Sequence, residues 1–178
     1  MSVYQTGLVS ISFRRHTVPE ILTACAACGL QAIEWGGDVH VPAGDVPRAQ
    51  EVLRQTRAAG LSAYSYGSYL RLGAADEEEV ARVAASAEAL GTRVVRVWGG
   101  VKGSAELTAE EYRALVAAAR RTCHAMPERT LALECHMNTV TDDCDAALRF
   151  LQDVGEENLA MYWQPHQFKG EAYNLRAA

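Results

Sequence analysis

Residues 131–136, Leu-Ala-Leu-Glu-Cys-His, decide the fold class of this sequence. Successive side chains of a β-strand point to opposite faces, so this stretch has one apolar face and one mixed face. The apolar face carries Leu131, Leu133 and Cys135, and the mixed face carries Ala132, Glu134 and His136. The apolar face suits packing against helices, and the mixed face suits the interior of a barrel of parallel strands.

Five further apolar runs occur along the chain, at Gly7–Phe13, Gln31–Trp35, Leu61–Tyr66, Arg93–Trp98 and Asn158–Trp163. Amphipathic segments lie between the runs, at Val18–Cys28, Val46–Ala59, Glu77–Leu90, Ala109–Ala125 and Asp142–Val154. The runs begin roughly 25 to 37 residues apart, which is about the length of one strand–helix unit. This alternation predicts an α/β fold with about six parallel strands and right-handed crossovers.

Helix boundary signals agree with these segments. Thr17 precedes Pro19 and Glu20, which suit a first helical turn, and residues 108–111, Thr-Ala-Glu-Glu, form a capping-box pattern. A glycine follows four of the segments, where a helix commonly ends in a left-handed residue; these glycines are Gly29, Gly60, Gly91 and Gly155.

Length and charge limit the organisation and the partners. The 178 residues suit a single domain over 1–178, and no linker-like segment divides them. The net charge of −5, from 17 basic and 22 acidic residues, argues against a general nucleic-acid binder. With no apolar stretch of about 18 residues, no membrane partner is expected. Five cysteines and no signal-like segment at Met1–Ser10 predict free thiols in the cytoplasm.

Polar and aromatic residues follow the predicted strands. Because the carboxyl ends of parallel strands meet at one edge, we expect these side chains to share one pocket. The candidates are His40 after the second strand, Tyr66 in the third, Arg96 and Trp98 in the fourth, Glu134 and His136 in the fifth, and Gln164 and His166 after the sixth.

Each candidate has a structural alternative. An isolated buried carboxylate is costly, so Glu134 needs a cation nearby. It forms either a structural ion pair with Arg96 or a metal-binding or acid–base group beside histidine and glutamine donors. Trp98 and Tyr66 either line a pocket or pack in the core. His40, in a loop after two glycines, has the same two alternatives.

At this point the sequence resembles the xylose-isomerase-like TIM-barrel superfamily of sugar isomerases and epimerases. The stretches that carry the resemblance cover essentially the whole chain; they are residues 32–42 (AIEWGGDVHVP), 65–73 (SYGSYLRLG), 94–99 (VVRVWG), 131–136 (LALECH), 139–142 (TVTD) and 162–165 (YWQP). Each motif is weak alone, but their order and spacing are more specific.

The resemblance implies a divalent metal (Mn²⁺, Mg²⁺ or Zn²⁺) and proton transfer on a carbon next to the carbonyl of a sugar or sugar phosphate. In epimerase-type members the metal ligands are a strand-five Glu, a strand-six Asp, a strand-seven His and a strand-eight Glu. The strand-five ligand and first base matches Glu134, while Gln164 stands at the strand-six position. His166 resembles the substrate-binding histidine, and His136, Trp98, Arg96, Tyr66 and His40 are the other substrate-binding candidates.

Two departures from the family pattern change these expectations. Gln164 is neutral, so the metal should bind weakly or not at all. The sequence carries about six of eight strand–helix units, so we expect an incomplete barrel that lacks the second glutamate base. We therefore predict an isomerase or epimerase family member with little activity as this chain.

Two alternatives remain open: a non-catalytic remnant, or a subunit whose open sheet edges are covered by another chain or a second copy. The abasic-site endonuclease branch of the superfamily is disfavoured by the five histidines and the negative charge.

Overall fold

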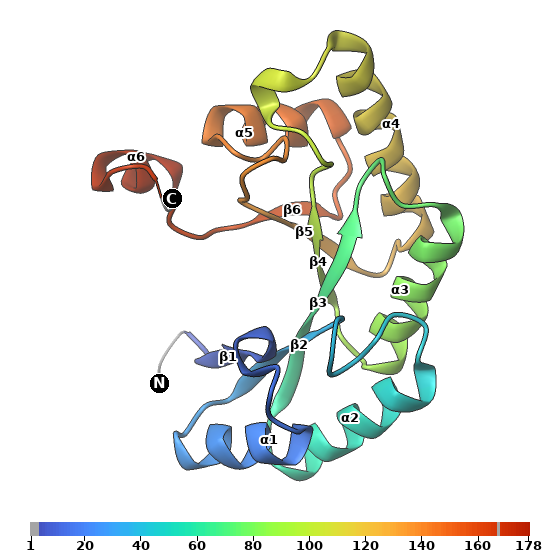
Figure 1. Cartoon of the computed structure of the whole chain (residues 1–178), viewed down its shortest axis with the longest axis vertical. Helices are drawn as coiled ribbons and strands as arrows, with labels where there is room; N and C mark the ends of the chain where they lie inside the picture. The colour runs from blue at the N-terminus through green and yellow to red at the C-terminus, as the bar shows by residue number, and fades with distance from the viewer. Residues whose placement is uncertain (1–3, 167) are drawn as a thin grey trace. The chain divides into compact units, whose positions relative to one another are not determined.

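The computed structural model describes residues 4–166 and 168–178, and it contains one six-stranded sheet in the order β1-β2-β3-β4-β5-β6 (Figure 1). The strands are β1 (Gly7–Val9), β2 (Ala32–Gly36), β3 (Ser62–Arg71), β4 (Val94–Trp98), β5 (Thr130–Glu134) and β6 (Leu159–Tyr162). The pairs β1–β2, β2–β3 and β5–β6 are parallel. The sequential order of an incomplete TIM barrel is confirmed, and a doubly wound sheet is excluded because its strand order reverses.

A helix follows each strand. The α-helices are α1 (Val18–Ala27), α2 (Val46–Ala58), α3 (Glu77–Ala89), α4 (Ala109–Ala125), α5 (Cys144–Val154) and α6 (Glu171–Ala177), and two short 3₁₀ helices are η1 (Ser10–Phe13) and η2 (Ser104–Glu106). None of the helices in the described part of the chain is both long and apolar enough to cross a membrane.

The chain forms two compact units. Of the described residues, unit 1 comprises 4–69 and 77–95, and unit 2 comprises 70–76, 96–166 and 168–178. Each unit has its own buried side chains, so each is described by itself.

In unit 1, α2 is tied to β2 by a buried hydrogen bond. The Trp35 indole Nε1 donates to Thr56 Oγ1 at 3.1 Å, and the Thr56 hydroxyl donates to the Val52 carbonyl oxygen at 2.7 Å. Trp35, Val52 and Ile33 are fully buried. A buried tryptophan whose N–H has a partner fixes the helix against the strand without a desolvation cost.

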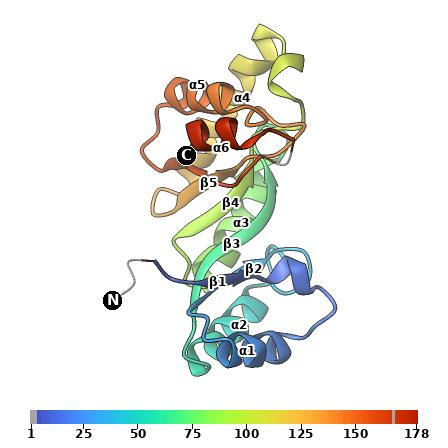
Figure 2. The same cartoon turned by 90° about the vertical axis from the view of Figure 1, so that its left-hand side faces the viewer.

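In unit 2, the apolar face predicted for β5 packs against helices. Leu131 and Leu133 are fully buried, as is Phe150 of α5, and α4 and α5 lie side by side (Figure 2). The Asn158 amide Nδ2 donates to three carbonyl oxygens at the end of α4 and in the following turn, those of Cys123, Met126 and Arg129, at 3.1–3.2 Å. One side chain therefore bridges the end of α4 and the turn that leads into β5.

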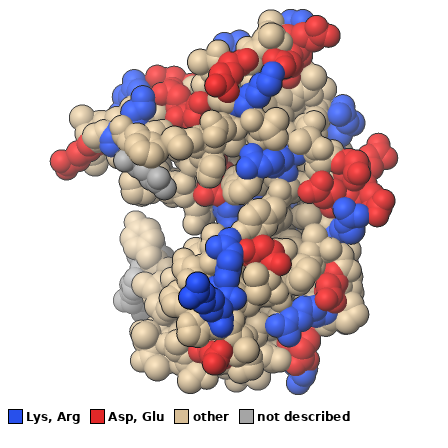
Figure 3. Space-filling model, viewed as in Figure 1, with Lys and Arg blue, Asp and Glu red and all other residues tan. Residues whose placement is uncertain are grey.

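The predicted helix boundaries are largely confirmed. Thr108 and Glu111 cap α4 reciprocally, with the Thr108 N–H donating to Glu111 Oε2 at 2.9 Å and the Glu111 N–H donating to Thr108 Oγ1 at 3.2 Å. The four predicted glycines all have positive φ, between 68° and 74°. Figure 3 shows acidic side chains gathered where α3 begins with Glu77–Glu79, a charge that favours a helix N-terminus.

Two strands differ in length from the prediction. β1 ends at Val9, because Ser10–Phe13 turn into η1, and β3 continues past Tyr66 to Arg71. Ser65–Ser68 are buried, and the Gly37 N–H donates to the Gly67 carbonyl oxygen at 3.0 Å. Gly67 therefore lies within β3 instead of ending it, and Arg71 is the last residue of the strand.

Candidate functional site

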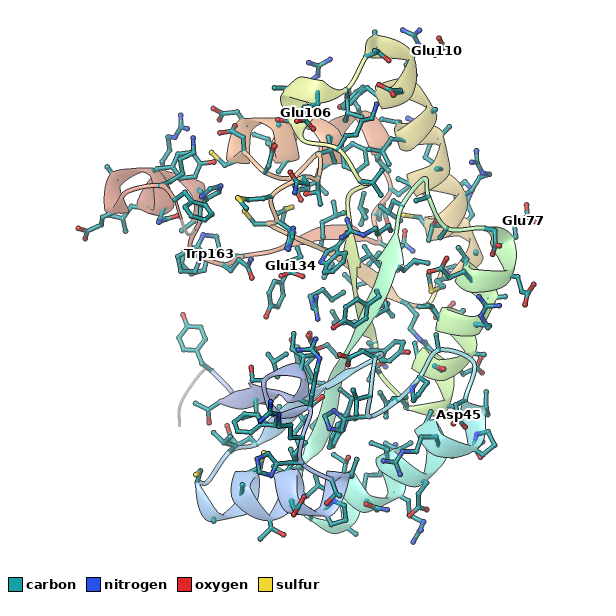
Figure 4. The ribbon with its side chains drawn as sticks, in the orientation of Figure 1. Asp45, Glu77, Glu106, Glu110, Glu134 and Trp163 are labelled. Carbon is teal, nitrogen blue, oxygen red and sulfur yellow. The ribbon has the colours of Figure 1, made fainter. Side chains whose placement is uncertain are left out.

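Glu134, the last residue of β5, lies at the centre of a polar cluster in unit 2 (Figure 4). Its Oε2 accepts hydrogen bonds from the Arg96 guanidinium and, at 2.5 Å, from the Trp98 indole Nε1. The side chain of Arg96 is 5 % exposed and that of Glu134 is 16 % exposed. The ion pair that the sequence offered as the structural alternative is therefore present, and both donors hold the same carboxylate oxygen.

The loop after β5 fixes the position of this carboxylate. The Thr141 hydroxyl donates to the Glu134 carbonyl oxygen at 2.6 Å and also contacts the Thr139 hydroxyl at 2.9 Å. Both threonines are fully buried, and the Val140 N–H donates to the Gly99 carbonyl oxygen at 2.8 Å. The Thr-Val-Thr-Asp stretch therefore ties the ends of β4 and β5 together.

A cavity of about 170 Å³ opens beside Glu134. It is lined by Glu134, Cys135, His136, Met137, Gln164, Pro165, His166 and Phe168. Four of the predicted site residues therefore share one cavity: the glutamate, the glutamine and both histidines. No described residue donates a hydrogen bond to Glu134 Oε1, so this oxygen is available to a ligand.

His136 offers one nitrogen to the cavity. Its Nδ1 lies 2.6 Å from the Met137 carbonyl oxygen, which can only accept, so Nδ1 carries the proton. In the neutral imidazole the lone pair is then on Nε2. The ring also packs at 5.1 Å from the Trp98 ring, which orients it next to Glu134.

Gln164 is held by its amide nitrogen, because Nε2 donates to the Cys135 carbonyl oxygen at 2.6 Å. Glu134 pairs with Tyr162 across the β5–β6 ladder, and Gln164 comes two residues later on the same face. Its Oε1 takes no hydrogen bond from a described residue. The oxygen of Gln164 is therefore free for a ligand in the same cavity.

His166 has structural partners at both ring nitrogens. Nε2 lies 3.1 Å from the Asp142 carbonyl oxygen, and Nδ1 accepts from the Phe168 N–H at 3.1 Å. These bonds fix the tautomer with the proton on Nε2. The ring therefore holds the segment after β6 and has no free nitrogen for a metal.

Arg71 joins this cluster from the end of β3. Its guanidinium carbon lies 3.9 Å from the centroid of the Trp98 ring, and Nη1 donates to the Gly100 carbonyl oxygen at 3.0 Å. Burial lowers the pKa of Arg71, and the charge of Glu134 opposes this shift. The sequence did not single out Arg71, because the predicted strand ended five residues earlier, at Tyr66.

Tyr66 and His40 lie in unit 1, and both are buried. The Tyr66 hydroxyl donates to the Val41 carbonyl oxygen at 2.8 Å, and burial raises the pKa of Tyr66 to about 12. His40 contacts Ser10 Oγ at 3.0 Å through Nδ1 and the His16 carbonyl oxygen at 3.1 Å through Nε2. Both side chains therefore have hydrogen-bond partners within unit 1.

A second polar cluster lies at the strand ends of unit 1. The Arg14 guanidinium pairs with Asp38, and it donates to the Tyr69 hydroxyl at 2.5 Å. Burial alone raises the pKa of Asp38, but hydrogen bonds from Arg14, the Val39 N–H and Tyr69 lower it below the ordinary value. Arg14, Asp38 and Tyr69 each follow a predicted strand, and this position is the sequence signal that could have found them.

A third group, Asp143, Cys144 and Asp145, has ligand atoms within 4.8 Å of one another. Asp143 Oδ1 accepts from the N–H groups of Asp145 and Ala146, at 2.9 and 3.4 Å, so it caps α5. Arg176 forms an ion pair with Asp145 at 3.3 Å. These carboxylates therefore have structural partners within the protein.

The residues at Glu134 suit a divalent cation better than that third group does. Glu134 Oε1, Gln164 Oε1 and His136 Nε2 are a carboxylate, an amide oxygen and an imidazole nitrogen, all at one cavity. Such mixed oxygen and nitrogen donors are typical ligands of Mg²⁺, Mn²⁺ and Zn²⁺. The set carries one negative charge and stands beside Arg96, so it favours weak binding.

A family model described as the xylose isomerase-like TIM barrel matches residues 22–172, which is most of the chain. A search of curated protein sequences gave no match.

Solved structures agree in fold. The probable 3-DHS dehydratase AsbF from Bacillus anthracis has a TM-score of 0.77 and 24 % identity, over 89 % of this chain and 62 % of that one. The IOLI protein, crystallised with a zinc atom, has a TM-score of 0.75 and 13 % sequence identity, and the match covers 98 % of this chain and 67 % of that one. A xylose isomerase-like TIM barrel protein from Mycobacterium smegmatis in complex with magnesium has a TM-score of 0.66 and 13 % sequence identity, and the match covers 89 % of this chain and 64 % of that one. This chain thus spans about two thirds of their lengths.

Proposed function

We infer that this chain, which belongs to the xylose isomerase-like TIM barrel family, moves a proton on the carbon next to the carbonyl of a sugar or sugar phosphate. The observation that carries this proposal is the state of Glu134. One carboxylate oxygen is held by Arg96 and Trp98, while the other lies free at a cavity shared with His136 and Gln164.

Glu134 is the proposed base. A general base must have a fixed position and an unoccupied lone pair aimed at the substrate, and proton transfer by such a group contributes about 10²–10⁴-fold to a rate. Arg96 and Trp98 fix Oε2, and the Thr141 hydroxyl fixes the main chain of the same residue. Oε1 is then the atom that takes the proton from the substrate carbon.

Gln164 Oε1 and His136 Nε2 would hold a divalent cation; Glu134 Oε1, which has two lone pairs, would offer one of them to the cation and keep the other for the proton. When bound, the cation polarises the carbonyl oxygen of the substrate and so acidifies the neighbouring carbon. The zinc and magnesium of the two related structures support this proposal as an analogy.

Glu134 is the only carboxylate among the described residues that line the cavity. Removing and returning a proton on one face of the substrate needs one base, but epimerisation needs a second base on the opposite face. We therefore expect the chain by itself to exchange the proton with solvent and to give little or no net epimerisation.

The test separates proton removal from turnover. The chain is incubated in D₂O with Mn²⁺, Mg²⁺ or Zn²⁺ and a panel of free and phosphorylated ketoses, and deuterium next to the carbonyl is measured by NMR. We expect metal-dependent exchange that E134Q lowers by about 10²-fold or more. E128Q, the same change at an exposed glutamate of unit 2, is the matched control and should leave exchange unchanged.

Failure has a clear form. Exchange absent with every metal and ketose, or exchange retained in E134Q, refutes Glu134 as the base. Binding of the sugars without exchange would instead favour the non-catalytic alternative, in which the chain is a remnant or needs another chain to complete its barrel.

A further inference from the structure

We propose that Arg71 binds an oxyanion of the substrate, so that the substrate carries a carboxylate or a phosphate group. This inference deepens the proposed function, on which it rests, by naming the substrate class. It stands on the place of Arg71, on the way its guanidinium is held and on the absence of an acidic partner.

Arg71 ends β3, just as Trp98 ends β4 and Glu134 ends β5. The carboxyl ends of parallel strands are where ligands bind in α/β barrels. Arg71 stacks on Trp98, and the indole of Trp98 donates to Glu134 at 2.5 Å. The guanidinium is therefore linked by one aromatic side chain to the proposed base.

The guanidinium is fixed through its face and one nitrogen. Stacking at 3.9 Å from the Trp98 ring centroid uses the face, and the bond to Gly100 uses Nη1. No described residue accepts a hydrogen bond from Nε or Nη2. Since a planar guanidinium presents its donors along its edge, a stacked arginine keeps a pre-oriented edge for a two-pronged contact with a carboxylate or phosphate.

The charge of Arg71 has no salt-bridge partner among the described carboxylates. Glu134 is the one acid that acts on the pKa of Arg71, and Glu134 is already paired with Arg96. A partly desolvated guanidinium without a counter-ion is unfavourable in the empty protein, and an oxyanion removes that cost.

The experiment measures binding, with and without Mn²⁺, by isothermal titration calorimetry. The probes are D-fructose, D-fructuronate and D-fructose 6-phosphate, which differ in carrying no anion, a carboxylate or a phosphate. We expect at least one anionic probe to bind wild type about tenfold or more tightly than fructose, because charge-assisted hydrogen bonds are stronger than neutral ones. The tighter of the two identifies the anion.

Two variants test the residue. R71Q should abolish the preference for the anion, and R71K should keep only part of it because a lysine lacks the planar fork. R113Q, which removes an exposed arginine of α4, is the matched control and should keep the full preference. Circular dichroism checks the fold of each variant, and R71K decides the result if R71Q does not fold.

Equal affinity of wild type for all three probes, no binding of any of them, or a full preference in R71Q overturns the proposal. Deuterium exchange is a separate readout. If E134Q abolishes exchange but wild type shows no preference for the anionic probes, the oxyanion site is refuted and the proton transfer by Glu134 is not. If R71Q abolishes the preference for the anion but no exchange occurs, the proton transfer is refuted and the oxyanion site is not.

Discussion

At the scale of the residue, Glu134 has two roles that pull in different directions. Its Oε2 completes a buried ion pair, while its Oε1 is free for chemistry. A carboxylate that only balanced Arg96 could use both oxygens for that purpose. Here both donors meet at one oxygen, and this asymmetry supports the proposal that Glu134 is a base as well as a counter-ion.

The ion pair predicts a stability effect. Glu134→Ala removes the carboxylate that pairs with the buried Arg96 guanidinium, and we expect a loss of about 3 kcal/mol in the free energy of unfolding. In the Arg96→Met background the same substitution should cost much less, because the charge of the Arg96 guanidinium is already absent. Urea unfolding of the four proteins measures the coupling.

The exposed pair Arg54–Glu51 is the control for this cycle, since both residues lie on the surface of α2 with side chains 73 % and 36 % exposed. Glu51→Ala should cost less than about 1 kcal/mol. A Glu134→Ala loss no larger than that of Glu51→Ala would mean that the ion pair is not buried as described.

At the scale of the element, β3 shows where sequence patterns fail. Gly67 and Ser68 are typical of a turn, so the pattern ended the strand at Tyr66. In the structure a Cβ on Gly37 would lie 2.8 Å from the Tyr66 hydroxyl, so the segment after β2 approaches β3 closely at this point. Gly67 pairs with Gly36 of β2, so the strand continues past Tyr66 through a tertiary contact that the local pattern does not contain.

Helix α5 offers a pH-dependent test at its N-cap residue, Asp143. Burial acts to raise the pKa of Asp143, but the N–H groups of Asp145 and Ala146 and the Tyr173 hydroxyl lower it below the ordinary value. A folded-state pKa below the unfolded one gives stability that is complete above about pH 4 and is lost as the pH falls through the folded value.

We therefore expect the stability difference between wild type and D143N to be constant from about pH 7 to 5 and to shrink below about pH 4. D143A should cost about 1 kcal/mol more than D143N at neutral pH, because asparagine still caps a helix and alanine does not. Thermal unfolding across this pH range measures both effects. A difference between wild type and D143N that grows on acidification would contradict the assigned hydrogen bonds.

At the scale of the whole molecule, the order of strands and helices was predictable because each apolar run and each amphipathic segment is a local pattern. The pairing of Arg96 with Glu134 also followed, since alternation puts both side chains on one face. The fixed tautomer of His166 and the stacking of Arg71 were not predictable. They depend on the carbonyl oxygen of Asp142 and on the ring of Trp98, which only the fold brings near.

The last prediction concerns the two ends of the strand order, β1 and β6. An edge strand exposes N–H and C=O groups that pair readily with another strand, and parallel sheets rarely leave their edges open. We propose that this 19.3 kDa chain associates with a second copy or another chain, and we expect sedimentation to show a mass above that of one copy as the concentration rises.

Hydrogen exchange locates the contact. Amides of β6 at Leu159–Tyr162 should become protected as association proceeds, whereas those of β5 at Thr130–Glu134 are already inside the sheet and should be protected at every concentration. A single-copy mass at millimolar concentration, with β6 amides exchanging at an unchanged rate, would show that the edge is stable alone, because short strands and a twisted edge resist pairing.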